Sequence, residues 1–238
     1  MGKLFKAQTA EGYTIKVLAD LLQNNIKTAC LLVDSDGIRL TMHDSHRRVC
    51  FSFKLESENF QIYKFRPVNS LYLGLNLNHF YKMIKSIKKK DAIILFISDT
   101  DPTVLGIKVI PKENNRVTTS FIKIQNIQNL DVTLPTNYTN PIIVPSNEYQ
   151  KMCKDMMAIS QEVRVNARKY SIKFFGDAGS VYSREVSFGE MDTDSDEEEE
   201  EEIIDYEDNF NTEQLARIVK IAGLGNNIQL FVGENLPM

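Results

Sequence analysis

Residues 75–102, LNLNHFYKMIKSIKKKDAIILFISDTDP, lie over residues 210–237, FNTEQLARIVKIAGLGNNIQLFVGENLP, without a gap and at a spacing of 135. Two cations are repeated in this match, since Lys82 falls on Arg217 and Lys85 falls on Lys220. Self-similarity at a fixed spacing indicates that one structural unit occurs more than once. We therefore expect two similar domains.

A second match has the same spacing. Residues 15–22 (IKVLADLL) lie over residues 150–157 (QKMCKDMM), which pairs Lys16 with Lys151. A duplicated fold must repeat its apolar residues, because each copy buries the same helix stripe, but it does not require cations at matching solvent-facing positions. The repeated cations therefore indicate a repeated anionic partner.

Length and composition are those of a globular protein with a large core. The 238 residues suffice for one large or two ordinary domains, and the repeat favours two. No run approaches the roughly 18 apolar residues of a membrane span, and the N-terminus has no signal-peptide pattern, so we expect an intracellular protein that is not secreted. Cys30, Cys50 and Cys153 lie scattered in apolar segments, which fits buried hydrophobic residues better than disulfides or a metal site.

The charge is divided unevenly along the chain. Residues 190–208 contain 13 acidic side chains and no Lys or Arg, whereas the remainder has 28 basic against 19 acidic residues. The net charge of -4 thus hides a basic body with one acidic segment. A basic body suits a polyanionic partner, although the charge alone does not select nucleic acid.

The pattern of apolar residues and turn signals predicts two helices and several strands in each copy. In the first copy we expect helices over 12–23 and 78–89, with strands over 4–7, 29–34, 37–42, 49–55, 92–98, 103–110 and 118–125. In the second copy we expect helices over 148–159 and 212–222, with strands over 162–167, 170–175, 180–188 and 227–232. The predicted domains are residues 1–120 and 142–238, joined by a connector over 121–141.

Each predicted helix has a cationic face opposite its apolar stripe. In the helix over 78–89, for example, Phe80 and Ile84 share one face and Lys82 and Lys85 the other. One such helix is unremarkable, but four at matching positions favour a shared anionic surface such as a phosphate backbone. No base-reading motif accompanies them, so we expect sequence-independent DNA binding by Lys16, Lys82, Lys85, Lys151, Lys154, Arg217 and Lys220.

Several separated motifs resemble one family in the same register. They are PSNEY at residues 145–149 with MCKDM at 152–156, GLNL at 74–77 before KMIK at 82–85, and MHDSH at 42–46. Together they resemble the sliding clamps of the proliferating cell nuclear antigen type, in that family's order from residue 5 to residue 238. The resemblance implies an α+β DNA-clamp fold, with two similar domains of antiparallel sheet and paired helices, and three chains that close head to tail into a ring.

The same resemblance implies a function without catalysis. The repeated cations would face double-stranded DNA and hold it by weak, salt-sensitive attraction while the ring slides. Expected partners are a DNA polymerase, a clamp loader, other replication and repair proteins with clamp-binding peptides, and two further copies of the chain. No cofactor is implied, and the expected location is the nucleus or a viral replication compartment.

The resemblance also implies a partner-peptide pocket and a subunit interface. The pocket residues would be Met42, His46, Val49, Leu134 and Pro135. Arg47 stands where the family usually has a small apolar residue, so we expect partners with an acidic flank. At the interface, the strand around 118–125 would pair with the strand around 180–188 of a neighbour, sealed by Phe121, Ile122, Val181 and Tyr182.

Two other functions compete with this interpretation. A monomeric or dimeric processivity factor of the same fold would hold DNA on one basic face without encircling it. An enzyme could in principle use the histidines and cysteines as nucleophile and base. His43 and His46 lie in one turn, however, and phosphate-loop and dinucleotide glycine patterns are absent, so we expect no catalytic and no metal site.

Two further expectations concern the end of the chain and the acidic segment. The second copy ends one residue after Pro237, without counterparts of the strands over 103–110 and 118–125, so we expect a sequence shortened relative to the family. The acidic residues 192–202 would usually form only a solvated loop. The alternative is that they keep DNA off the outside of the ring or recruit basic partners.

Overall fold

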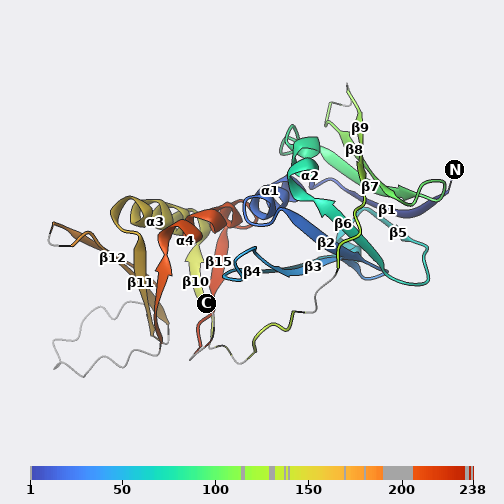
Figure 1. Cartoon of the computed structure of the whole chain (residues 1–238). Coiled ribbons are helices and arrows are strands. Elements are labelled where there is room, and N and C mark those ends of the chain that lie inside the picture. The colour runs from blue at the N-terminus through green and yellow to red at the C-terminus, as the bar shows by residue number, and fades with distance from the viewer. Residues whose placement is uncertain are drawn as a thin grey trace. The chain divides into compact units, whose positions relative to one another are not determined.

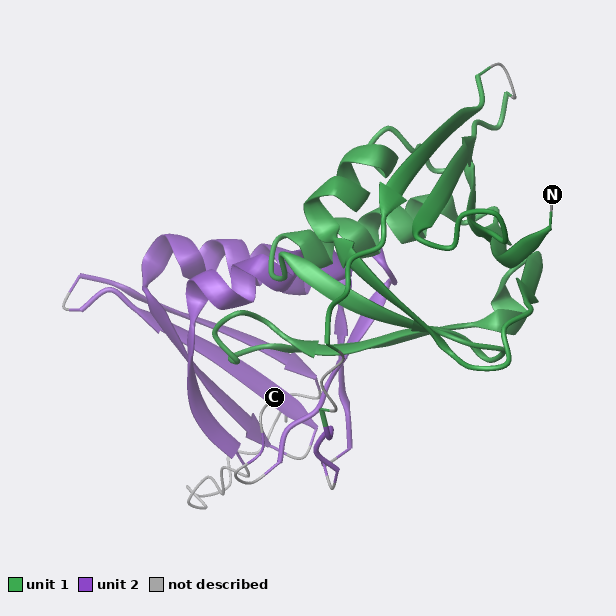
Figure 2. Cartoon of the chain, turned by 45° about the vertical axis from the view of Figure 1, so that its right-hand side comes forward, with its two compact units in different colours: residues 1–132 green, residues 133–238 purple. Residues whose placement is uncertain are grey.

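The computed structural model divides into two compact units, residues 1–132 and residues 133–238 (Figures 1 and 2). The structure describes residues 2–113, 116–128, 132–136, 138, 140–168, 170–179, 181–189, 206–233, 236 and 238. The acidic residues 192–202 lie outside this set. In the described part of the chain, no helix is long and apolar enough to cross a membrane.

The described residues of unit 1 form two antiparallel sheets, two α-helices and the short 3₁₀-helix η1 (Ser57–Asn59) (Figure 1). The five-stranded sheet has the order β5-β1-β7-β8-β9, and the four-stranded sheet has the order β4-β3-β2-β6. The helices are α1 (Gly12–Gln23) and α2 (Leu77–Ile84). The strands are β1 (Lys3–Thr9), β2 (Thr28–Val33), β3 (Gly37–His43), β4 (Cys50–Glu56), β5 (Ile62–Phe65), β6 (Leu71–Asn76), β7 (Ala92–Ser98), β8 (Val104–Ile110) and β9 (Thr118–Lys123).

Unit 2 contains a two-stranded sheet, β10-β15, and a four-stranded sheet with the order β13-β12-β11-β14. Its helices are α3 (Ser146–Ile159) and α4 (Thr212–Ile218), and the 3₁₀-helix η2 (Val219–Gly223) follows α4. The strands are β10 (Ile142–Pro145), β11 (Glu162–Arg168), β12 (Ser171–Asp177), β13 (Ser183–Gly189), β14 (Tyr206–Asn211) and β15 (Asn227–Leu230).

Each unit has a hydrophobic core between its helices and sheets. In unit 1, Phe5 of β1 and Ile84 of α2 are fully buried in one cluster that also contains residues of both sheets. In unit 2, Met156 of α3 packs with Val165 of β11 and Phe174 of β12. Alternate residues of β11 are buried, which places its other side chains on the sheet face away from the helices.

The two units share one plan at the spacing found in the sequence. Strand β6 (Leu71–Asn76) and β14 (Tyr206–Asn211) differ by 135 at both bounds, and each runs directly into the second helix of its unit. In both units the second helix is capped at its N-terminus by an asparagine, because Asn76 accepts the N–H of His79 and Asn211 accepts the N–H of Glu213. The prediction of two similar α+β units is confirmed.

All four predicted helices are present, but the one after β6 is shorter than expected, and the helix predicted over 212–222 is divided into α4 and the 3₁₀-helix η2. Helix α2 ends at Ile84, so Lys85 is its C-cap and Lys89 lies in the turn before β7. The sequence pattern missed strands β5, β6, β10 and β14. Residues 121–123, expected at the start of the connector, belong to strand β9 instead.

Candidate functional site

The predicted DNA-binding cations lie on helices that pack in pairs. Helix α1 contacts α2 in unit 1, and α3 contacts both α4 and η2 in unit 2. In each helix an apolar stripe faces the core, represented by Ile15 in α1, Phe80 in α2, Met152 in α3 and Leu215 in α4. The cations lie away from these apolar stripes, on the sides of the helices that face solvent. Each unit therefore has one layer of paired helices with cations on its outer side.

In unit 1 the three predicted cations differ in their surroundings. The Nζ of Lys16 donates a hydrogen bond of 2.9 Å to the carbonyl oxygen of Ile87, which ties α1 to the turn after α2. Lys82 and Lys85 are exposed, and neither forms an ion pair with another described residue. Their charges are therefore open to an anionic partner.

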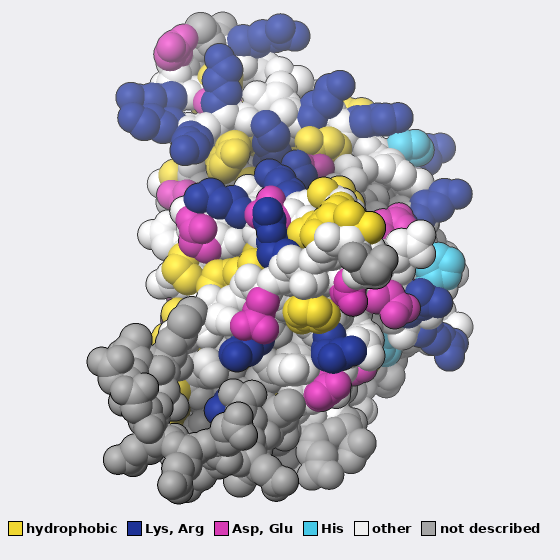
Figure 3. Space-filling view, turned by 90° about the vertical axis from the view of Figure 1, so that its left-hand side faces the viewer, with side chains coloured by type: hydrophobic (Ala, Val, Ile, Leu, Met, Phe, Trp, Pro, Cys, Tyr) yellow, Lys and Arg dark blue, Asp and Glu magenta, His cyan; other side chains and the backbone are white. Residues whose placement is uncertain are grey.

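In unit 2 the predicted cations include two that form ion pairs with acidic residues of the same helix. Lys151 forms an ion pair of 2.8 Å with Glu148, and Arg217 forms one of 2.6 Å with Glu213. All the side chains in these pairs are substantially exposed, so each pair contributes little to stability. Figure 3 shows Lys and Arg side chains standing out from one face of the molecule, with acidic side chains interspersed.

A tight turn between β3 and β4 positions three of the predicted pocket residues, Met42, His46 and Val49. The backbone N–H of Asp44 donates to the carbonyl of Val49 at 2.8 Å, and the Oδ1 of Asp44 accepts the N–H groups of Arg48 (2.7 Å) and Val49 (3.0 Å). Burial favours a raised pKa for Asp44, but the backbone donors of Val49, Arg48 and His46 together outweigh it and hold the pKa below its ordinary value.

Exposed side chains surround this turn. His46 is exposed, and Arg47 is exposed with a backbone φ of 56°, in the left-handed region that few residues other than glycine adopt. Met42 and Val49 are half-buried. The remaining predicted pocket residues, Leu134 and Pro135, are exposed and belong to unit 2, so the structure brings together only the part of the pocket that lies in unit 1.

The strands predicted to meet between subunits are both sheet edges. Strand β9 pairs only with β8, and β13 only with β12, among the described residues. Phe121 of β9 is 65% exposed, and in the loop before β13 Val181 is 78% and Tyr182 53% exposed.

Ile122 departs from its predicted role in sealing the interface. It is only 8% exposed and packs in the core of unit 1. The reason is that successive side chains of a strand point to opposite faces, so Phe121 faces outward where Ile122 faces inward. An interface at β9 would use Phe121 and the backbone edge of the strand.

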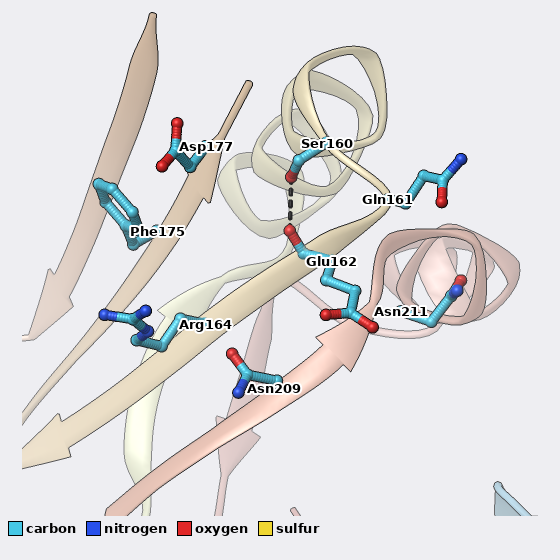
Figure 4. Close-up of a pocket in the computed structure, with 8 residues that line it drawn as sticks. All are labelled: Ser160, Gln161, Glu162, Arg164, Phe175, Asp177, Asn209 and Asn211. Carbon is cyan, nitrogen blue, oxygen red and sulfur yellow. Dashed lines mark hydrogen bonds between the residues drawn. The ribbon is translucent and has the colours of Figure 1, made fainter. Parts of the chain in front are cut away.

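Unit 2 also has two pockets that sequence reasoning missed. One, of about 410 Å³, lies on the outer face of the four-stranded sheet, where the Arg164 guanidinium sits 5.9 Å from the centre of the Phe175 ring (Figure 4). The other, of about 420 Å³, is mainly apolar and is lined by Tyr149, Ile218, Leu230 and Phe231 among others. Neither contains a predicted site residue.

The three thiols differ in exposure, since Cys30 and Cys153 are buried and Cys50 is exposed. Burial raises the pKa of Cys153 to about 11, which keeps this thiol protonated near neutral pH. Cys50 is exposed, contrary to the expectation of burial, because it begins the edge strand β4. No group of three or more His, Cys, Asp or Glu side chains is placed to hold a metal ion in the part of the chain that the structure describes.

Comparison with known proteins matches both units to one family. Residues 4–133 match the model described as the N-terminal domain of proliferating cell nuclear antigen, and residues 133–238 match the C-terminal domain. The chain belongs to the proliferating cell nuclear antigen family. The two family models meet at residue 133, where the structure passes from unit 1 to unit 2.

Relatives within the proliferating cell nuclear antigen family are similar over nearly the whole chain. The probable DNA polymerase sliding clamp 1 of Paramecium bursaria Chlorella virus 1 is 25% identical, covering 99% of this chain and 90% of the relative. Proliferating cell nuclear antigen of Chaetomium thermophilum is 26% identical, with coverages of 99% and 91%. The crystal structure of the Entamoeba histolytica protein superimposes with a TM-score of 0.81 at 19% identity, covering 98% of this chain and 90% of that one, which shows the same fold.

Proposed function

We propose that this protein is a DNA sliding clamp that surrounds duplex DNA and tethers a polymerase to it. The observation that carries the proposal is the repetition of a cationic helix pair in two units of the same plan. A continuous anionic rod such as duplex DNA presents phosphates to both units at once, so it can use both pairs. A viral relative that is named a probable DNA polymerase sliding clamp supports the same function.

In this proposal the cations act by electrostatic attraction alone. Lys16, Lys82 and Lys85 in unit 1 would contact phosphates, together with their counterparts Lys151, Arg217 and Lys220 in unit 2. Lys154 of unit 2, which corresponds to Ala19, would add a further contact. Contacts to phosphate carry no direct sequence information and weaken as salt increases. The protein would therefore hold DNA without reading bases, and no bond would be made or broken.

Retention on DNA would come from assembly into a homotrimeric ring. Strand β9 of one chain would pair with β13 of the next, because each is the outermost strand of its sheet among the described residues and has exposed apolar side chains nearby. Phe121 would lie against Val181 and Tyr182 of the neighbouring chain. An assembled ring cannot leave the duplex sideways, so each phosphate contact can stay weak.

Partner proteins would dock at the turn between β3 and β4. Met42, His46 and Val49 would form one side of the peptide pocket, and Leu134 and Pro135 of the connector the other. The connector would be the segment between β9 and β10, and Arg47 would favour partners with an acidic flank. The polymerase and the clamp loader are the partners expected in the nucleus or in a viral replication compartment.

The function can be tested by measuring mass and retention together. Light scattering on the purified chain at micromolar concentration should give three times the mass of one chain. A clamp loaded on closed circular DNA should stay bound in high salt and leave once the circle is cut, because only the topological link resists salt. A monomer that leaves circular and cut DNA equally would favour a processivity factor that does not encircle its template.

A further inference from the structure

We propose that unit 1 provides the larger share of the attraction for DNA, through a lysine turn at residues 88–90 that unit 2 lacks. The inference rests on the proposed clamp function, because it assigns the phosphate contacts unequally within that function. The turn joins α2 to β7 and carries three consecutive lysines, all exposed. They are additional to Lys82 on α2 and to Lys85 at its C-cap.

The structure fixes the backbone of this turn. Ile87 before it and Asp91 after it are buried, with exposed fractions of 1% and 7%. The Oδ2 of Asp91 accepts the N–H of Lys88 at 2.8 Å, and the N–H of Asp91 donates to the carbonyl of Lys88 at 3.1 Å. The carboxylate of Asp91 is therefore engaged by the backbone, and the three ammonium groups project from a fixed base.

The turn lies next to the predicted cations of α1 and α2. Lys16 of α1 donates its Nζ hydrogen bond to the carbonyl oxygen of Ile87, the residue just before the three lysines. Lys85, at the C-cap of α2, lies three residues before Lys88. Cations from α1, α2 and the turn thus adjoin one another in unit 1.

Unit 2 has no such lysines at the corresponding place. At the spacing of 135, residues 88–90 correspond to Gly223, Leu224 and Gly225. Leu224 is exposed, so this position in unit 2 presents an apolar side chain to solvent where unit 1 presents an ammonium group. The shared fold therefore does not require the lysines, and their presence needs another cause.

The second helices of the two units, α2 and α4, also differ in charge, and again unit 1 is the less acidic. Glu213 of α4 pairs with Arg217, whereas the corresponding residue of α2 is the neutral Asn78. The first helices, α1 and α3, do not reverse this difference in unpaired cations. Helix α3 has one lysine more than α1, but its Lys151 is paired with Glu148. Each cation that binds a phosphate releases counterions from the DNA. The unit with more unpaired cations should therefore contribute more of the affinity for DNA and more of its salt dependence.

The experiment compares matched losses of three charges. The unit 1 variant combines Lys88→Gln, Lys89→Gln and Lys90→Gln, which keeps every backbone N–H of the turn. The unit 2 variant combines Lys154→Gln, Arg217→Gln and Lys220→Gln. A control variant combines Lys54→Gln, Lys64→Gln and Arg66→Gln, which removes three cations from the strand region of unit 1.

Binding of each variant to a fluorescent 30-base-pair duplex is measured by anisotropy across a series of NaCl concentrations, and the unfolding midpoint checks that each variant is folded. We expect the unit 1 variant to lose the most affinity. The slope of log affinity against log salt should become shallower by about 1 for each lysine that contacts phosphate. The unit 2 variant should lose less, and the control should resemble the wild type.

A second pair of variants exchanges one charge between the units. Asn78→Glu gives α2 the acid of α4 and should weaken binding, whereas Glu213→Asn removes that acid from α4 and should strengthen it. Equal losses from the two triple variants, or a larger loss in unit 2, would overturn the inference and leave the clamp function standing. A wild-type chain whose affinity for the duplex does not change with salt would instead overturn the proposed function.

Discussion

At the scale of single residues, Asp44 stabilises the turn between β3 and β4, where partner peptides would dock. Its Oδ1 is the acceptor for the backbone N–H groups of Arg48 and Val49. Replacing Asp44 by alanine leaves these donors without that acceptor, so we expect a loss of about 1–3 kcal/mol in the free energy of unfolding. Urea unfolding at neutral pH measures this loss. Asp44→Asn retains an acceptor oxygen and should lose less; equal losses would contradict the role assigned to the carboxylate.

The lowered pKa of Asp44 also predicts how this contribution changes with pH. A carboxyl whose pKa is lower in the folded chain than its unfolded value of about 3.9 favours folding when ionised. The stabilisation should be fully present above about pH 5 and should be lost as the pH falls through the folded pKa. The stability difference between the wild type and Asp44→Asn, measured by urea unfolding from pH 7 downward, should therefore shrink in acid. A difference that stays constant would contradict the shift.

Arg47 offers a test of partner preference because of its backbone conformation. Asparagine tolerates the left-handed region, so Arg47→Asn removes the charge while keeping the turn, whereas a β-branched residue would strain it. We expect Arg47→Asn to weaken binding of a clamp-binding peptide with an acidic flank several-fold and to leave a neutral-flank peptide unchanged. Calorimetric titration of the two peptides measures both affinities. An equal effect on both would contradict a charge preference.

At the scale of elements, the helices were easier to predict than the strands. Helix α1 has the predicted bounds because its apolar stripe and the neighbouring turn signals agree. Strand β14, YEDNFN, has four polar residues and follows an acidic run, so local sequence does not favour a strand. It forms because β11 pairs with it along its whole length, which is a tertiary effect. Its counterpart β6 was missed as well, and the sequence match between the two copies begins only at residues 75 and 210, so the repeat covers just the last two residues of each strand.

The early end of α2 has a similar explanation. Its apolar and cationic pattern continues to Lys89, but the buried Asp91 binds the N–H of Lys88 and turns the chain towards β7. Helical periodicity cannot show a contact of this kind, because the contact forms only when Asp91 is buried in the folded chain. The three lysines consequently lie on a turn, where their side chains are not restricted to one helix face.

Gly74 in β6 anchors the start of the connector. The N–H of Gln125 donates to the carbonyl of Gly74 at 2.7 Å, and a Cβ at Gly74 would meet the backbone oxygen of Gln125. We expect Gly74→Ala to cost about 1–3 kcal/mol and to speed protease cleavage in the connector, because the two backbones must separate. Urea unfolding and limited proteolysis measure the two effects. Gly225→Ala, where the nearest atom is 3.6 Å away, is the control and should change neither.

At the scale of the whole molecule, neighbouring residues of β9 should separate folding from assembly. Ile122→Ala removes a buried core side chain and should cost about 2–5 kcal/mol in unfolding free energy. Phe121→Ala removes an exposed side chain, so we expect little change in stability but a shift from trimer to monomer at low concentration. Unfolding curves and light scattering together distinguish the two. A Phe121→Ala variant that keeps its full assembly would contradict the proposed edge pairing.

The sequence predicted the duplication and the cationic helices, because both follow from apolar periodicity and charge spacing within single segments. It did not predict which face each residue of β9 presents, since that depends on which side of the sheet is covered. The ion pairs of Lys151 and Arg217 were also missed, although Glu148 and Glu213 lie one turn away on the same helices and could have indicated them.

The two free edges also determine the symmetry that an assembly of this chain would have. Strand β9 belongs to unit 1 and β13 to unit 2, so pairing between copies would join unlike surfaces. Contacts of this kind are heterologous and give closed rings or open filaments, without a two-fold axis that exchanges neighbours. Every copy of the turn between β3 and β4 would then face the same side of the ring. The assembly would have a front and a back, and a polymerase bound to it would meet DNA in one direction only.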